Sequence, residues 1–142
     1  MTASHIDQND TLCANIRMSG QTKSIYYRDH NPDKIALRQV FGNEEYSLKN
    51  VRRLGDIQAL YRGLKDPLIL DLGAHIGSSA AFFRCEFPES QVVAVEPECG
   101  NFGVLEKNAE IFDFSTLRAA VGCDSASEVQ LYDRGNGSMA FT

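Results

Sequence analysis

The 142-residue chain has few cysteines, and their positions exclude two classes of small protein. The four are widely scattered, at Cys13, Cys85, Cys99 and Cys123. There is no C-x-x-C pair, and no histidine follows at the spacing of a zinc site. We therefore expect neither a disulfide scaffold nor a metal centre, but free thiols in a reducing cytoplasm.

Long apolar runs and basic runs are also missing. No apolar stretch reaches the roughly 18 residues of a membrane span, and Met1–Gly20 lacks the core of a signal peptide. The net charge of −5 and a pI near 5.1 argue against nucleic acid as a partner, since Arg52-Arg53 is an isolated basic pair. We expect a cytoplasmic protein with neither a membrane nor a nucleic-acid partner.

Residues 67–96 have the pattern of a strand–helix–strand unit. The apolar run Leu68–Leu70 ends at Asp71, and the second run, Val92–Val95, ends at Glu96. Neither run alternates with polar residues, which predicts strands buried on both faces of a parallel sheet. A glycine turn and one helix length of small and aromatic residues lie between them. The pattern predicts an α/β, Rossmann-like fold, with a mostly parallel sheet and helices on both of its faces, that binds a nucleotide-like cofactor.

The glycine turn does not fit the dinucleotide fingerprint G-x-G-x-x-G. Counting from Gly73, the third position is His75 and the sixth is Ser78. This mismatch disfavours a nicotinamide-dependent oxidoreductase. The spacing D-x-G-x-x-x-G, from Asp71 to Gly77, is instead typical of S-adenosylmethionine-dependent methyltransferases.

Each residue of this unit has a chemical role in that interpretation. Gly73 and Gly77 let the backbone turn and let a ligand approach, and the next helix begins with unpaired amide donors. Glu96, at the end of the second strand, is placed to accept hydrogen bonds from both ribose hydroxyls. The alternatives are a purely structural turn at the glycines and a helix-capping role for Glu96.

For three further residues, the sequence leaves two roles open. Asp71 either orders the turn through backbone amides or reaches the amino group of the cofactor. Asn101 either contacts the ligand side of the site or serves the start of a helix. For His75 we favour filling a variable position of the turn over acting as a general base.

Three segments together resemble the FkbM-type methyltransferases: ILDLGAHIGSSAAFF, VVAVEPECGNFGVLEKNAE and LRAAVGCDSASEVQLYD. The resemblance covers roughly Ile25 to Tyr132. It implies methyl transfer from S-adenosylmethionine to a hydroxyl of a sugar or other small metabolite. Together with the turn pattern, it places these residues at the cofactor: Asp71, Gly73, Ala74, His75, Gly77, Glu96, Asn101, Ala120 and Val121.

The resemblance also bears on residues outside the glycine turn. Many methyltransferases have an aspartate for the adenine amino group where this chain has Ala120, so backbone groups near Ala120 and Val121 would recognise adenine instead. Arg28, Asp33 and Tyr46 match recurrent family positions. The alternative for these three is a surface ion pair and a partly buried tyrosine.

The chain divides into a flexible N-terminus (1–14), a hairpin and helical cap (15–66) and a partial cofactor-binding core (67–142). In the cap we expect a hairpin about Gly20 and a helix from Asn31 to Gly42 with Ile35, Leu37, Val40 and Phe41 inward. A second helical stretch carries Ile57, Leu60 and Tyr61. In the core we expect, in order, a helix over 101–112, a strand over 116–121, an edge strand over 127–132 and a glycine-rich end over 133–138.

The family's fourth-strand segment, lysine-x-aspartate-x-glutamate-glycine, does not occur in the sequence. We therefore expect a core that is incomplete at its C-terminus, a truncated methyltransferase with no assigned catalytic residue. The strand at 68–72 would keep an open edge, which favours a homodimer or a strand-completing partner. The alternative function is a non-catalytic cofactor-binding or interaction module completed by a partner chain.

Overall fold

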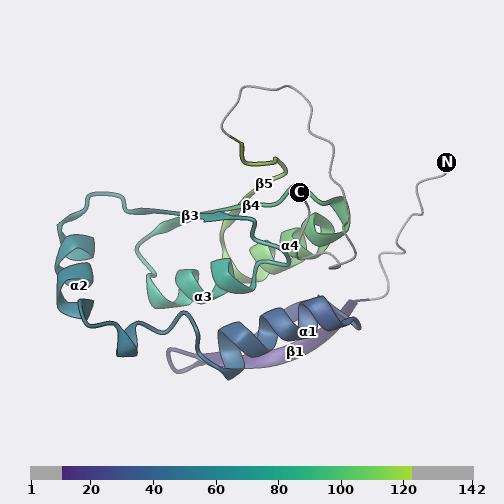
Figure 1. Cartoon of the computed structure of the whole chain (residues 1–142), viewed down its shortest axis with the longest axis horizontal. Coiled ribbons are helices and arrows are strands. Elements are labelled where there is room, and N and C mark those ends of the chain that lie inside the picture. Colours follow the sequence, from purple (N-terminus) through teal and green to yellow (C-terminus); the bar gives the residue numbers. More distant parts are fainter. Residues whose placement is uncertain (1–10, 123–142) are drawn as a thin grey trace.

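The computed structural model describes residues 11–122, and its elements form three layers (Figure 1). A parallel sheet lies above helices α3 and α4, and an N-terminal hairpin with helix α1 lies below them. The N-terminal elements are β1 (Thr11–Met18), β2 (Gln21–Arg28), α1 (Asn31–Leu37), η1 (Arg38–Gly42), η2 (Leu48–Asn50) and α2 (Leu54–Gly63). The core elements are β3 (Leu68–Leu72), α3 (Ser78–Glu86), β4 (Gln91–Val95), α4 (Cys99–Phe112) and β5 (Ser115–Leu117).

The sheet has the order β3-β4-β5, and both pairs of strands are parallel. Successive parallel strands that advance in one direction, joined by right-handed crossovers, put their connecting helices on the same face. Accordingly, α3 and α4 both lie on the side that faces the hairpin (Figure 1). The predicted mixed α/β architecture with a parallel sheet is confirmed, whereas helices were expected on both faces and α3 and α4 cover only one.

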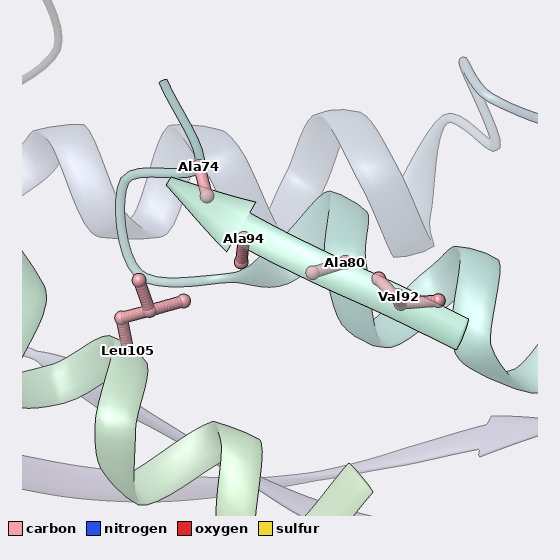
Figure 2. Packing of buried hydrophobic residues seen from close by; sticks show 5 residues of the cluster. All are labelled: Ala74, Ala80, Val92, Ala94 and Leu105. Carbon is pink, nitrogen blue, oxygen red and sulfur yellow. The ribbon is translucent and has the colours of Figure 1, made fainter. Parts of the chain in front are cut away.

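Small side chains form the contact between the sheet and its helices (Figure 2). Ala80 of α3 and Ala94 of β4 have no exposed surface, and Ala74 and Val92 are almost as deeply buried. Leu105 of α4 packs against this alanine cluster and is also fully buried. With so little side-chain volume between them, helix and sheet approach closely and hold the turn after β3 in place.

A second cluster joins the hairpin to the far side of the helices. Ile25 of β2, Ala81 of α3 and Phe112 of α4 make its buried centre. The hairpin turns at Ser19-Gly20, both with positive φ, as a tight two-residue connection requires. β1 begins at Thr11, so the chain is a paired strand over the last four positions of the expected flexible segment, 11–14. Positions 1–10 lie outside the described residues.

Of the four residues expected to face inward from the helix that begins at Asn31, Val40 is buried, and Leu37 and Phe41 are partly buried against the cluster around Ile25 and Phe112. Ile35 is 47% exposed, so its expected inward position was wrong. The buried positions are Asp33, Ala36 and Val40, which share one helical face. Because Asp33 is drawn inward by Arg28, that face turns toward the core and Ile35 turns toward solvent.

Strand β3 is not buried on both faces, contrary to the sequence prediction. Leu68, Leu70 and Leu72 are each 55–56% exposed, while the intervening Ile69 packs against the alanine cluster. The reason is that α3 and α4 cover only one face of the sheet. Within residues 11–122, β3 pairs with β4 alone, so its other edge has no partner strand in this part of the chain.

The C-terminal end of the sheet is shorter than expected. β5 spans three residues, whereas a strand was predicted over 116–121. The predicted edge strand at 127–132 and the glycine-rich end at 133–138 lie outside the described residues. No helix in the described part of the chain is long and apolar enough to cross a membrane.

Gly77 and Gly103 give a matched test of the packing around α4. A β-carbon at Gly77 would lie 2.6 Å from Cδ1 of the buried Leu105, at a φ of +84°, whereas one at Gly103 would meet nothing within 4 Å. We expect Gly77→Ala to lower the free energy of unfolding by about 1–3 kcal/mol. Gly103→Ala should raise it by about 0.4–1 kcal/mol. Urea unfolding measures both, and equal effects would contradict this packing.

Candidate functional site

The candidate site lies at the carboxyl ends of β3 and β4, where the chain after β3 bends back over its neighbour. The backbone N–H groups of Gly73 and Ala74 both donate to the carbonyl oxygen of Val95 at 2.9 Å. The next amide, of His75, donates to Oε2 of Glu96 at 2.9 Å. The glycine turn and the carboxylate of Glu96 therefore lie together at the carboxyl ends of the strands.

The two glycines of the turn serve different purposes. Both have positive φ, +82° at Gly73 and +84° at Gly77, so both fit the backbone conformation that favours glycine. Gly77 is pressed against Leu105 and Phe114, which makes its role structural. A β-carbon at Gly73 would point into open space. Of the two, Gly73 is the one at which a ligand can approach the main chain.

Asp71 orders the turn, which was one of its two predicted roles. Its Oδ2 accepts a hydrogen bond of 2.6 Å from the hydroxyl of Ser79, and the N–H of Ala80 also donates to the carboxylate. It thereby ties the end of β3 to the first turn of α3. Burial raises the pKa of the Asp71 carboxyl, the two hydrogen bonds oppose this, and the charge of Glu96 adds to the rise.

Glu96 is a buried carboxylate, 5% exposed, held by three donors. Besides the His75 amide, the N–H of Glu98 at 3.1 Å and Nδ2 of Asn101 at 3.0 Å donate to Oε1. A carboxylate offers about four acceptor positions, so about one remains for a ligand. Holding both ribose hydroxyls, as predicted, would require one of these donors to move.

Helix capping, the alternative role for Glu96, falls to a residue that the sequence analysis missed. Glu98 is the N-cap of α4, and its carboxylate accepts from the amides of Gly100 at 2.8 Å and Asn101 at 2.6 Å. An acid directly before a helical pattern was the signal that would have identified it. The cap of α4 is thus Glu98, whereas Glu96 accepts from the N–H of Glu98 and from the side chain of Asn101.

Asn101 connects Glu96 to the N-terminal elements. Its side chain has no exposed surface. Its Nδ2 donates to Glu96, and its Oδ1 accepts from Nη2 of Arg28 at 2.7 Å. Asn101 therefore orients the carboxylate, so its role is not confined to the start of the helix.

Arg28 and Asp33 form a buried ion pair, so the alternative of a surface pair was wrong. The Asp33 side chain has no exposed surface and that of Arg28 is 11% exposed. The arginine donates to both carboxylate oxygens, from Nε at 3.0 Å and from Nη2 at 2.9 Å. Asp33 also accepts the backbone N–H of Arg28 at 2.8 Å. The pair fastens the end of β2 to α1.

Two histidines complete this cluster. Nε2 of His75 lies 3.2 Å from Oδ1 of Asp33, and Nε2 of His30 lies 3.5 Å from the same oxygen. Burial tends to raise the pKa of Asp33, but hydrogen bonds from His75 and Arg28 outweigh it and hold that pKa far below its ordinary range. Burial lowers the pKa of His30, although Asp33 opposes this. Through its imidazole and its amide, His75 links Asp33 to Glu96.

Asn108, also missed from sequence, binds the hairpin to the turn. It is fully buried and pairs with the backbone of Tyr26, accepting from its N–H at 2.7 Å and donating to its carbonyl at 2.9 Å. The same amide donates to the carbonyl of Ile76 at 2.8 Å. The available signal was a polar residue at a helical spacing from the apolar Leu105, Ala109 and Phe112.

The remaining predicted residues lie apart from this network. Ala120 and Val121 are exposed and follow β5, whose last carbonyl, of Leu117, accepts the amide of Glu96 at 3.1 Å. Tyr46 is 44% exposed, and its ring packs beside Phe82 and Phe83. Ala74 belongs to the site through its backbone, because its side chain is in the alanine cluster.

Two further observations concern the surroundings of the site. A hollow of about 670 Å³ is lined by parts of β1, η1 and α3, and no residue of the glycine turn lines it. Within residues 11–122, no group of three or more histidine, cysteine, aspartate or glutamate side chains is arranged so that it could hold a metal ion.

Comparison of the chain with protein-family models, with curated proteins and with solved structures gives no match.

The buried Asp33 predicts a specific dependence of stability on acid. Its pKa is depressed in the folded chain, while an unfolded aspartate titrates near about 3.9. The stabilisation is therefore complete above that pH and is lost as the pH falls below about 4. Asp33→Asn should cost about 3–5 kcal/mol at pH 7, because it leaves Arg28 buried without a countercharge.

Denaturant unfolding between pH 7 and pH 2.5 measures this dependence. The difference in unfolding free energy between the wild type and Asp33→Asn should narrow below about pH 4. Asp66→Asn, at an exposed carboxylate, is the control and should follow the wild type. A difference that stays constant with pH would contradict the assignment.

Proposed function

We propose that the chain binds S-adenosylmethionine at the turn after β3 and belongs to an O-methyltransferase that modifies a sugar or another small hydroxyl compound. The observation that carries this proposal is the pairing of an open glycine with a buried carboxylate. Gly73 leaves free space over the main chain, and Glu96 keeps about one acceptor position at the adjacent strand end.

The fold supports a nucleotide-like ligand, and one residue of the turn disfavours a dinucleotide. The parallel order β3-β4-β5 and the strand-end site agree with a Rossmann-like core, in which ligands bind at the carboxyl ends of the strands. Where the dinucleotide fingerprint has a glycine beside the pyrophosphate, this chain has His75. Its side chain is directed to Asp33 and is only 12% exposed. Together, these features favour a nucleoside over a ligand with a pyrophosphate bridge.

The chemistry that such a cofactor supplies is a displacement at a sulfonium. The bond from the methyl carbon to sulfur breaks as the bond from carbon to the acceptor oxygen forms, and the hydroxyl proton passes to a base. The described residues account for holding the nucleoside. His75 is committed to Asp33 through its Nε2, which supports the structural role favoured for it over that of a base. We assign no catalytic residue.

Calorimetric titration tests the cofactor. We expect S-adenosylhomocysteine to bind the wild-type chain and NAD not to bind. Glu96→Gln should weaken the binding of S-adenosylhomocysteine by about ten- to a hundredfold, since hydrogen bonds to charged groups contribute about 1.5–3 kcal/mol. Glu89→Gln, at an exposed carboxylate of the loop after α3, is the matched control and should bind as the wild type does.

A ligand series makes the same test without relying on the fold of a variant. Adenosine should bind more tightly than 2′,3′-dideoxyadenosine, because only adenosine carries a ribose hydroxyl that can donate a hydrogen bond to Glu96. If NAD bound more tightly than adenosine, or if the two nucleosides bound equally, the result would be incompatible with the proposed site.

The open edge of β3 favours a second function, that of an interaction module completed by another chain. We propose a second copy as the partner. The exposed leucines are placed symmetrically about Leu70, so a two-fold axis through this residue sets Leu68 opposite Leu72 of the partner in an antiparallel pair. Unpaired backbone groups along such an edge favour strand addition.

Sedimentation velocity tests this pairing. The wild type should dimerise with increasing concentration, and Leu70→Lys should stay monomeric, since a lysine on an edge strand opposes pairing. Leu60→Lys, at a 67% exposed leucine of α2, is the control and should dimerise as the wild type does. A monomeric wild type at the highest soluble concentration would refute the proposal.

A further inference from the structure

The carboxylate of Glu96 is fixed by donors that are themselves fixed from another layer of the molecule. Two of its three donors belong to His75 and Asn101. Each of these residues has a second polar contact that leads away from the sheet. For Asn101 the partner is Arg28, at the end of β2, and for His75 it is Asp33, in α1.

Arg28 is bound in a geometry that only a guanidinium can supply. Its Nη2 donates both to Asp33 at 2.9 Å and to Asn101 at 2.7 Å, while Nε donates to the other oxygen of Asp33 at 3.0 Å. A lysine at this position keeps the positive charge but lacks the planar fork, so it cannot maintain all these contacts.

Asp33 makes the corresponding contact with the glycine turn. Its Oδ1 lies 3.2 Å from Nε2 of His75, the residue whose amide binds Glu96. His75 has φ of +53°, a conformation that side-chain-bearing residues seldom adopt. The contact with Asp33 supports this conformation and so directs the amide toward Glu96.

We propose that Arg28 and Asp33 are positioning residues for ligand binding, which act through Asn101 and His75 to hold Glu96 in its binding geometry. The hairpin and α1 are then part of the binding site rather than a separate cap. The effect on affinity rests on the proposed function, whereas the effect on Glu96 is a property of the free protein and is tested separately.

A matched pair of arginine variants separates positioning from general stabilisation. Arg28→Lys removes the fork that joins Asp33 and Asn101. Arg84→Lys removes a comparable fork, which binds Asp113 and the carbonyl of Pro88 and contacts none of the three donors of Glu96. Both changes keep the charge, and both remove an arginine that crosslinks two segments.

The first measurement is amide hydrogen exchange of the free protein by NMR. The reference is the amide of Leu105, in the buried interior of α4. In Arg28→Lys we expect the ratio of the protection factor of the His75 amide to that of Leu105 to fall by at least about tenfold, because the hydrogen bond from the His75 amide to Glu96 loosens. In Arg84→Lys the ratio of these two amides should stay at the wild-type value. An unchanged ratio in Arg28→Lys, or the same change in both variants, would overturn the proposal.

The second measurement is titration with S-adenosylhomocysteine. Arg28→Lys should weaken binding by about tenfold or more, and Arg84→Lys should bind as the wild type does. Loss of His75 protection without loss of affinity would overturn the role in binding. If the wild type itself does not bind this ligand, the proposed function fails, and the exchange ratio alone decides whether Arg28 positions Glu96.

Discussion

Burial of the Glu96 carboxylate is the constraint on which the rest of the site depends. A charge taken out of water must be met by donors, or it costs several kcal/mol. Glu96 meets this need with two backbone amides and one side-chain amide, from the turn, from the residue before α4 and from α4 itself. Because each donor must be aimed at the same two oxygens, the carboxylate fixes how these segments lie relative to one another.

The same requirement couples the outer layer to the sheet. Asp33, also buried, is neutralised by Arg28, and the pair reaches Glu96 through Asn101 and His75. Apolar contacts alone would let the hairpin slide over α3 and α4, because they are not directional. The polar contacts set one register, and Asn108 adds another by pairing with Tyr26. The hairpin is thus placed by hydrogen bonds and stabilised by the cluster around Ile25 and Phe112.

Local patterns predicted the elements well, and contacts between distant residues explain the differences. Apolar runs ending in acids located β3 and β4, and the spacing of Gly73 from Glu96 placed both at one sheet edge. Periodicity could not show that Ile35 faces solvent, because this depends on Asp33 being drawn to Arg28. The leucines of β3 have the pattern of a doubly buried strand, but burial also needs an element on the second face. Sequence spacing carries no information about that partner.

The glycine turn shows why one motif can conceal two kinds of constraint. Gly73 and Gly77 share a positive φ, so backbone conformation alone gives the same reason for both. The surroundings distinguish them, since Leu105 and Phe114 crowd Gly77, while the space beside Gly73 is open. The packed glycine sets the distance between α3 and α4, and the open one borders Glu96. A pattern of glycines therefore locates a site, whereas the packing around each glycine determines which of them a ligand can reach.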